Sequence, residues 1–128
     1  MITLSLLKYL ENNGFGQIDE DLFWQKLSLG KKGLYISDLG EEQSRDRRKS
    51  QLFELFYRGS SDVQGYQALQ EIVDFLNQSY GVCSLPAVPP VTESGYDNVV
   101  IMPLSTIASV GEDANGRVIY NVTGRIYY

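Results

Sequence analysis

One stretch of the sequence decides the fold, residues 61–81, which read SDVQGYQALQEIVDFLNQSYG. Its first four residues have the S-x-x-Q form of a capping box, in which Ser61 and Gln64 satisfy free amides at a helix start. Gly81 supplies a stop at the other end. Between them, apolar residues recur at helical spacing: Tyr66, Leu69, Ile72, Val73, Leu76 and Tyr80. We therefore predict a helix whose apolar stripe covers a sheet.

The sequence before this helix predicts a second helix and then strands. Residues 2–13 carry leucines near helical spacing, with Thr3 as a possible cap and Gly14 as the end. Short strands are predicted around residues 22–27 and at 34–37, bounded by glycine-containing turns.

Residues 40–49 form the most charged stretch, without any apolar residue to anchor it. We predict a long hairpin connection here, with the next strand beginning near Arg48 and running to Tyr57. Connections of this length inside a compact domain are usually functional or disordered.

The C-terminal part reads as a proline-rich segment followed by strands. Residues 82–98 hold three of the four prolines, which predicts a rigid crossing segment rather than a strand. Strands are predicted at 99–102, 105–110 and 118–127, with a tight turn at Asn115-Gly116 between the last two. In the last strand, alternation predicts one packed face and one wet or partner-facing side. The packed face carries Val118, Tyr120, Val122 and Ile126, and the other side carries Arg117, Asn121, Thr123 and Arg125.

These elements predict a single domain over residues 1–128 of the α+β class. We expect an antiparallel sheet of about five to six strands with two helices packed on one face. The chain has 128 residues, 43% of them apolar, which suits one compact core.

Composition removes most routes to catalysis. The chain has no histidine and one cysteine, which excludes His-dependent triads, an internal disulfide and a multi-cysteine zinc site. Cys83 is read as a small buried hydrophobe. The adjacent acids Asp19, Glu20 and Asp21 would alternate faces on a strand and so would not converge on one metal ion. We predict no enzyme activity, no metal and no cofactor.

Charge is unevenly distributed along the chain. The formal net charge is −5, which disfavours tight nucleic-acid binding. Yet eight of the eleven basic residues fall within residues 26–58. This polarity suits an assembly protein whose opposite surfaces meet unlike partners. No apolar run reaches the roughly 20 residues of a membrane helix, and the N-terminus lacks a basic leader, so we expect the protein to stay where it is made.

Several runs of the sequence resemble bacteriophage proteins of the tail terminator and minor capsid families. The runs are Phe23-Trp24-Gln25-Lys26-Leu27, residues 30–36, residues 45–58, residues 62–66 and residues 71–76. The resemblance covers roughly residues 1–80, and the terminal hairpin by pattern. It includes no active-site motif.

The resemblance implies a structural protein of a long-tailed phage (a siphovirus). Tail terminators form hexameric rings that close the tail tube and then meet head-completion (neck) proteins in head–tail joining. The implied partners are other copies of the chain, the tail tube protein and the neck protein, while genome DNA passes through the lumen without sequence-specific binding. The implied location is the tail–head junction of the virion, assembled in the cytoplasm of the host bacterium. No membrane is implied.

The predicted contact residues gather in the charged stretch. Arg45, Arg47, Arg48 and Lys49 are expected to face the lumen or the acids of an adjacent ring, with Glu41 and Glu42 in the same loop. Trp24, Arg117 and Arg125 are further candidates for subunit contacts.

Three alternatives remain open at this point. A neck (stopper) or minor capsid protein would belong to the same virion. A DNA-binding module would use the basic loop and would bind duplex DNA in a salt-sensitive way. An enzyme would need a deep pocket that gathers Asp or Glu with Lys.

A double charge reversal tests the loop assignment. We expect Arg47→Glu with Arg48→Glu to leave a folded subunit, because neither position belongs to an apolar stripe, but to prevent head–tail joining during phage assembly. Circular dichroism checks the fold and electron microscopy counts joined virions. Normal virion assembly by this double variant would refute the assignment.

Overall fold

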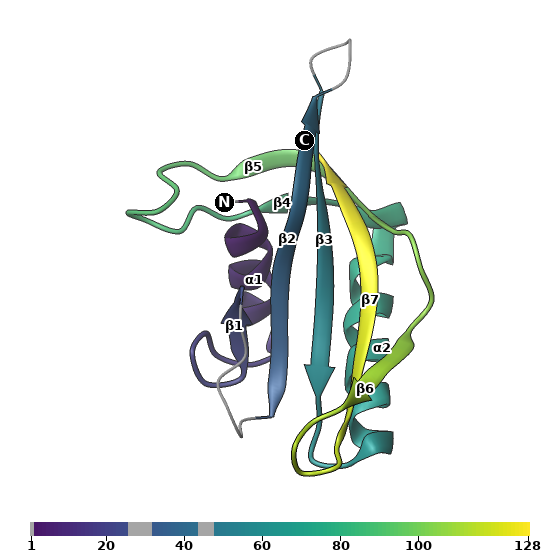
Figure 1. The fold of residues 1–128 in the computed structure, drawn as a ribbon. Helices are drawn as coiled ribbons and strands as arrows, with labels where there is room; N and C mark the ends of the chain where they lie inside the picture. The colour runs from purple at the N-terminus through teal and green to yellow at the C-terminus, as the bar shows by residue number, and fades with distance from the viewer. Residues whose placement is uncertain (1, 26–31, 44–47) are drawn as a thin grey trace.

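The computed structural model describes residues 2–25, 32–43 and 48–128 (Figure 1). Within these ranges the chain is α+β, as predicted, with two α-helices, one 3-10 turn and a sheet of seven strands. The elements in chain order are α1 (Ile2–Asn12), β1 (Leu22–Trp24), β2 (Gly33–Gln43), β3 (Lys49–Arg58), α2 (Asp62–Leu76), η1 (Gln78–Gly81), β4 (Val82–Leu85), β5 (Tyr96–Pro103), β6 (Ala108–Glu112) and β7 (Val118–Tyr127).

The sheet is mixed rather than purely antiparallel. Its strand order is β1-β2-β3-β7-β5-β4, and β6 also pairs with β7. All neighbours run antiparallel except β1 and β2, which are parallel, with Leu22 opposite Leu34 and Trp24 opposite Ile36. The predicted antiparallel pairing is therefore wrong only at the β1 edge, and the sheet has seven strands where about five to six were predicted. A three-residue strand such as β1 is too short for alternation to reveal its pairing partner.

The sheet is curled, and the two helices contact different parts of it. In Figure 1, β4 and β5 cross at one end of the long strands β2, β3 and β7. Helix α1 contacts β1, β2, β3 and β4, including strands from both ends of the sheet order, whereas α2 contacts β3 and β7. The helices meet through aromatic rings, with Phe75 of α2 against Tyr9 at 5.3 Å and against Phe15 at 5.0 Å between ring centroids. The simple layer with both helices side by side on one face is not confirmed, because the curl wraps the sheet around α1.

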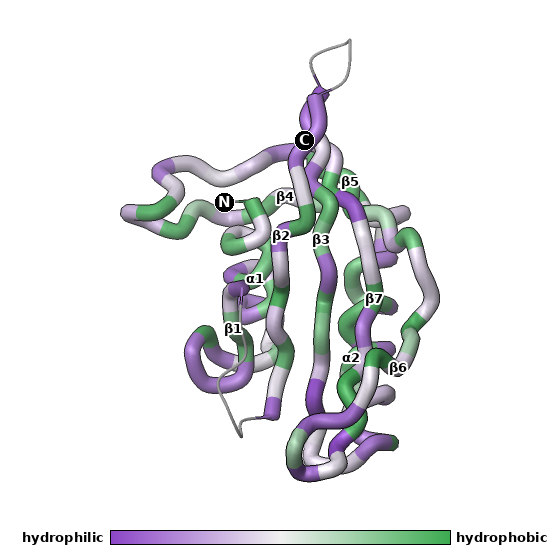
Figure 2. Tube along the Cα trace, viewed as in Figure 1, coloured by the Kyte–Doolittle hydropathy of each residue, from purple (hydrophilic) through white to green (hydrophobic). Residues whose placement is uncertain are grey.

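The core lies between the helices and the sheet, where apolar residues concentrate (Figure 2). Every second residue of the central strands is buried there: Leu34 and Ile36 in β2, Phe53 and Leu55 in β3, and Val122 and Ile126 in β7. The helices contribute Leu6, Leu7, Leu10, Leu69 and Ile72. The bounds of β7 are confirmed, and its predicted packed face is confirmed at Val122 and Ile126, which are buried, and at Tyr120, which packs against the core.

Among its described residues, the charged stretch 40–49 is strand at both ends rather than a long loop, and the predicted start of the next strand near Arg48 is confirmed. Strand β2 continues to Gln43 and β3 begins at Lys49, so Glu41 pairs with Gln51 and Glu42 with Ser50. Backbone hydrogen bonds hold a ladder together without apolar side chains, which is why the polar composition misled the prediction. The residues between 43 and 48 lie outside the described part of the chain.

Three further predictions need correction. Residues 82–98 contain β4 and the start of β5, and the prolines Pro86, Pro89 and Pro90 lie in the connection between them. Thr3 lies inside α1, fully buried, and is not a cap. Helix α2 ends at Leu76 rather than near Gly81, so Tyr80 leaves the apolar stripe and is 97% exposed.

Gly81 has a different role from the predicted helix stop. It is the last residue of η1, with a φ of +77°, and a Cβ there would lie 2.1 Å from the carbonyl oxygen of Ile101. Glycine is therefore required where the chain turns from η1 into β4 against β5.

The predicted start of α2 is confirmed. The Ser61 Oγ accepts from the Gln64 N–H at 3.2 Å, and the Gln64 Oε1 accepts from the N–H of Ser60 at 2.9 Å. The Gln64 side chain thus accepts from the residue before the N-cap, whereas in the usual capping box it accepts from the N–H of the N-cap residue itself.

Removal of this cap should destabilise the fold. We expect Ser61→Ala to lower the free energy of unfolding by about 1 kcal/mol, because one amide at the start of α2 loses its acceptor. The control is Ser94→Ala at an exposed bend, expected to change stability by less than about 0.5 kcal/mol. Urea denaturation measures both, and equal effects at the two serines would contradict the capping role.

Candidate functional site

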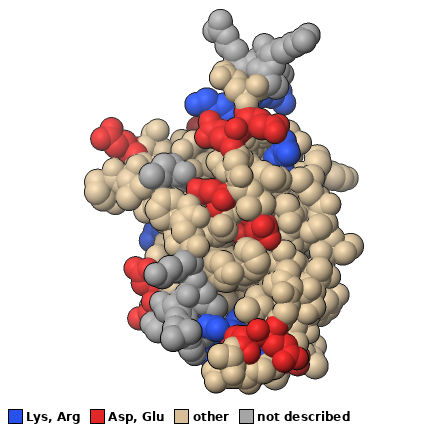
Figure 3. Space-filling model, in the orientation of Figure 1, with Lys and Arg blue, Asp and Glu red and all other residues tan. Residues whose placement is uncertain are grey.

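The candidate site is the projecting end of the β2–β3 hairpin, here called the arm and defined by residues 41–43 and 48–50. Its charged residues Glu41, Glu42, Arg48 and Lys49 are all exposed. Figure 3 shows acidic and basic side chains intermixed where the arm leaves the body. The structure thus brings four of the predicted contact residues together, while Arg45 and Arg47 lie outside the described residues.

Arg125 joins the arm from β7. Its Nη1 lies 3.1 Å from the Glu42 Oε2 and 3.4 Å from the Ser50 Oγ, so the guanidinium links β7 to β2 across β3. The Glu42 side chain is 75% exposed, so solvent screens this ion pair. Such a pair contributes between about 0 and 1 kcal/mol to folding.

The other face of the arm contacts the chain's last residue. Backbone hydrogen bonds join Lys49 and Tyr128 in both directions, at 3.0 and 2.9 Å. Burial raises the pKa of the Tyr128 hydroxyl well above its usual value, and a hydrogen bond to Glu41 adds to the rise. The Tyr128 ring also packs edge-on against Tyr96, with centroids 5.5 Å apart. The base of the arm is therefore held on both faces.

A hollow of about 270 Å³ opens beside the arm. Its lining residues are Arg48, Asn98, Val100, Tyr127 and Tyr128. The Arg48 guanidinium, the Asn98 amide and the two tyrosine rings surround Val100. This lining suits a ligand that has a polar or acidic group attached to an apolar part.

Trp24 is an internal anchor rather than a residue of the arm. Its Nε1 donates to the Thr3 Oγ1 at 3.0 Å, and the Thr3 hydroxyl donates to the carboxylate of Asp38. These two consecutive hydrogen bonds link β1, α1 and β2. A subunit contact by Trp24 stays a prediction, since the structure gives its indole nitrogen an intramolecular role.

Arg117 also has an intramolecular partner, which sequence reasoning missed. Its Nε lies 3.5 Å from the Asp113 Oδ2, and the Arg58 Nη1 lies 3.2 Å from the same oxygen. The other carboxylate oxygen accepts from the N–H groups of Arg117 and Asn115, at 2.9 Å each. The backbone hydrogen bond from Arg117 is the largest cause that lowers the pKa of Asp113, and both arginine charges lower it further. The run Asp113 to Arg117 signalled a turn but not its ion pairs.

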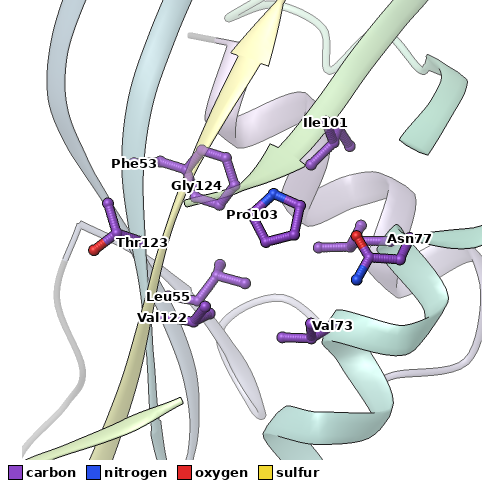
Figure 4. Close-up of a pocket in the computed structure, with 10 residues that line it drawn as sticks. Phe53, Leu55, Val73, Asn77, Ile101, Pro103, Val122, Thr123 and Gly124 are labelled. Atoms are coloured by element: carbon purple, nitrogen blue, oxygen red, sulfur yellow. The ribbon is translucent and has the colours of Figure 1, made fainter. Parts of the chain in front are cut away.

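The cavity beneath α2 has no catalytic character (Figure 4). Phe53 and Leu55 of β3, Val73 of α2 and Val122 of β7 point into it, and no titratable side chain lines it. It has room for about one water-sized group. This is a packing gap of the core.

The acids near the N-terminus are exposed and separate. Asp19, Glu20 and Asp21 lie in the turn before β1, where the Asp21 carboxylate accepts from the N–H of Gln17. Among the described residues, no three His, Cys, Asp or Glu side chains are grouped so that they could hold a metal ion. The described helices include none that is long and apolar enough to span a membrane.

No model of a known protein family matches the sequence, and no curated protein shows significant similarity to it. The resemblance to phage tail proteins therefore stays a prediction. The geometry of the arm is the main guide to function.

The pKa of Asp113 gives a pH-dependent prediction. A carboxyl with a lowered folded-state pKa adds stability above its unfolded pKa, near 4, and loses it as the pH falls through the folded value. We expect Asp113→Asn to be less stable than the original chain at pH 7, and the difference to shrink below about pH 4. Urea denaturation at pH 7 and pH 3 measures this.

The matched control is Glu112→Gln, which neutralises the exposed neighbouring carboxylate of β6. Its effect at pH 7 should be clearly smaller than that of Asp113→Asn. An Asp113→Asn effect that persists unchanged at pH 3 would show that the carboxylate charge is not its source.

Proposed function

We propose that this chain is a structural protein of a long-tailed bacteriophage, which closes the tail tube as a ring of copies and takes part in head–tail joining. The observation that carries the proposal is the arm, a charged two-stranded extension held rigidly at its base. The resemblance of several sequence runs to tail terminator proteins supports the same reading.

The arm suits recognition between rigid protein rings. Eleven residues of β2 span about 33 Å at strand geometry, and the strand extends beyond the buried part of the sheet. Backbone pairing with β3 makes this extension stiff, and stiffness lowers the entropy lost on docking. Charges of both signs at fixed positions select a complementary partner and set its register.

The mixed charge favours a protein partner over DNA. Glu41 and Glu42 share the arm with Arg48 and Lys49, and Arg125 is paired with Glu42. A phosphate-binding surface needs basic side chains without interleaved acids. The runner-up is therefore a neck (stopper) protein, which would use the same arm against a different ring.

Purified tail tubes give a direct test. We expect the chain to bind selectively at tube ends and to appear there as a sixfold species by native mass spectrometry and electron microscopy. Lys49→Glu should reduce end binding by about tenfold or more, because it reverses a charge on the arm. Salt should weaken binding, because exposed charges are screened.

The matched control is Lys32→Glu, the same charge change on an exposed residue just before β2, at the opposite end of the strand from the arm. It should bind tube ends like the original chain. Absence of end binding by the original chain would contradict the terminator role, and binding to the neck protein instead would favour the runner-up.

A further inference from the structure

An apolar strip lies on the outer face of the sheet where β4, β5 and β7 adjoin. Val82 of β4 pairs with Val100 of β5, and Val100 pairs with Tyr127 of β7. Residues directly opposite one another share a face, and both neighbours of Val100 are buried on the other face. Val82, Val100 and Tyr127 therefore stand outward in one row. Met102 extends the row, and Val82 and Met102 are 48% and 45% exposed.

This strip, defined as Val82, Val100, Met102 and Tyr127, is bordered by two arginines, Arg48 and Arg125, here called the basic border, and Arg125 also pairs with the exposed Glu42. Met102 lies opposite Arg125, and the hollow lined by Arg48 and Asn98 adjoins Val100 and Tyr127. A peptide segment with acidic and small or apolar side chains would suit this surface. Its apolar atoms would cover the strip, and its carboxylates would contact the arginines of the basic border.

The opposite end of the molecule carries the matching charge. Residues 9–25 contain four acids and no lysine or arginine. Asp19 and Glu20 are exposed in the turn before β1, and the Asp21 carbonyl accepts from the N–H of Leu34 at the start of β2. The arm and the hollow adjoin the other end of β2, about 33 Å away at strand geometry.

We propose that the acidic turn, residues 17–21, of one copy docks on the apolar strip and its basic border on the next copy. The choice of a second copy rests on the proposed function as a ring, and the charge match supports it. Two unlike surfaces on opposite ends of one chain give a heterologous contact, which closes into a ring when the rotation permits. Contact between two acidic turns would bring like charges together.

Disulfide trapping detects this contact even when it is short-lived. In a Cys83→Ala background, one variant carries Glu20→Cys and a second carries Met102→Cys. The two are mixed with a mild oxidant, at low salt, and mixed disulfides are counted by mass spectrometry. We expect the 20–102 disulfide to form at least about tenfold faster than the disulfide in a control mixture, in which Glu71→Cys on the exposed side of α2 replaces Glu20→Cys.

Charge exchange separates docking from chance collision. Arg48→Glu in the Met102→Cys partner should slow the 20–102 disulfide, and Asp19→Lys in the Glu20→Cys partner should restore its rate. Equal rates for the 20–102 pair and the 71–102 control would overturn the proposal. If Arg48→Glu slows the 20–102 disulfide and Asp19→Lys does not restore its rate, the pairing of the acidic turn with the basic border would be overturned.

The test is independent of tube capping. Fast 20–102 trapping by a chain that ignores tube ends would support the contact and contradict the terminator role. Capping of tube ends without 20–102 trapping, alone or on tubes, would leave the proposed function standing and overturn this contact.

Discussion

The structure depends on the two backbone ladders of β3. This strand pairs along nearly its whole length with β2 on one edge and with β7 on the other. Its alternation then places Phe53 and Leu55 in the core, while Glu54 and Phe56 face outward. The outward side chains contact residues of the two neighbouring strands. The Phe56 ring stacks on Tyr35 of β2 with centroids 4.5 Å apart, and the Glu54 carboxylate accepts from the Asn121 amide of β7 at 2.8 Å. Both α-helices and the strands β1, β5 and β6 contact this three-stranded unit directly, and β4 joins the sheet through β5.

The arm is the continuation of the same ladder beyond the core. Apolar burial stops where β2 passes Asp38, and a bulge between Asp38 and Gly40 changes the register there. Hydrogen bonding continues to the pair Gln43–Lys49, where side chains no longer contribute to the core. A bulge bends and twists a strand locally, so it is a natural point for the hairpin to leave the body.

Prediction from sequence succeeded where side-chain periodicity and burial coincide. Helix α2, strand β7 and the turn at Asn115 all carry local signals, and all three were found. Strand at Glu41–Gln43 and at Val82–Leu85 was missed, because ladder hydrogen bonds rather than residue types define those segments. The strand β1 was predicted within residues 22–27, but its parallel pairing with β2 was not. Hydrophobic periodicity gives no signal at Glu41–Gln43, because neither face of the strand is buried there.

The candidate site shows the same division. Composition identified the charged residues of the arm, but the ion pair between Glu42 and Arg125 joins positions 83 residues apart in the sequence. Only the order β2-β3-β7 brings them together. Arg117 and Trp24 looked equally suited to subunit contacts, yet Asp113 and Thr3 are their partners within the chain.

The surface charges of this chain matter more to recognition than to stability. An exposed pair such as Glu42–Arg125 adds little to folding, because water screens it in the folded and unfolded states alike. The same charges keep their positions, because backbone ladders rather than the ion pairs themselves hold the arm. A partner that excludes water on docking would strengthen each correct pairing and leave each wrong one desolvated. Charge placed on a rigid, apolar-poor extension therefore specifies a partner at little cost to the stability of the isolated subunit.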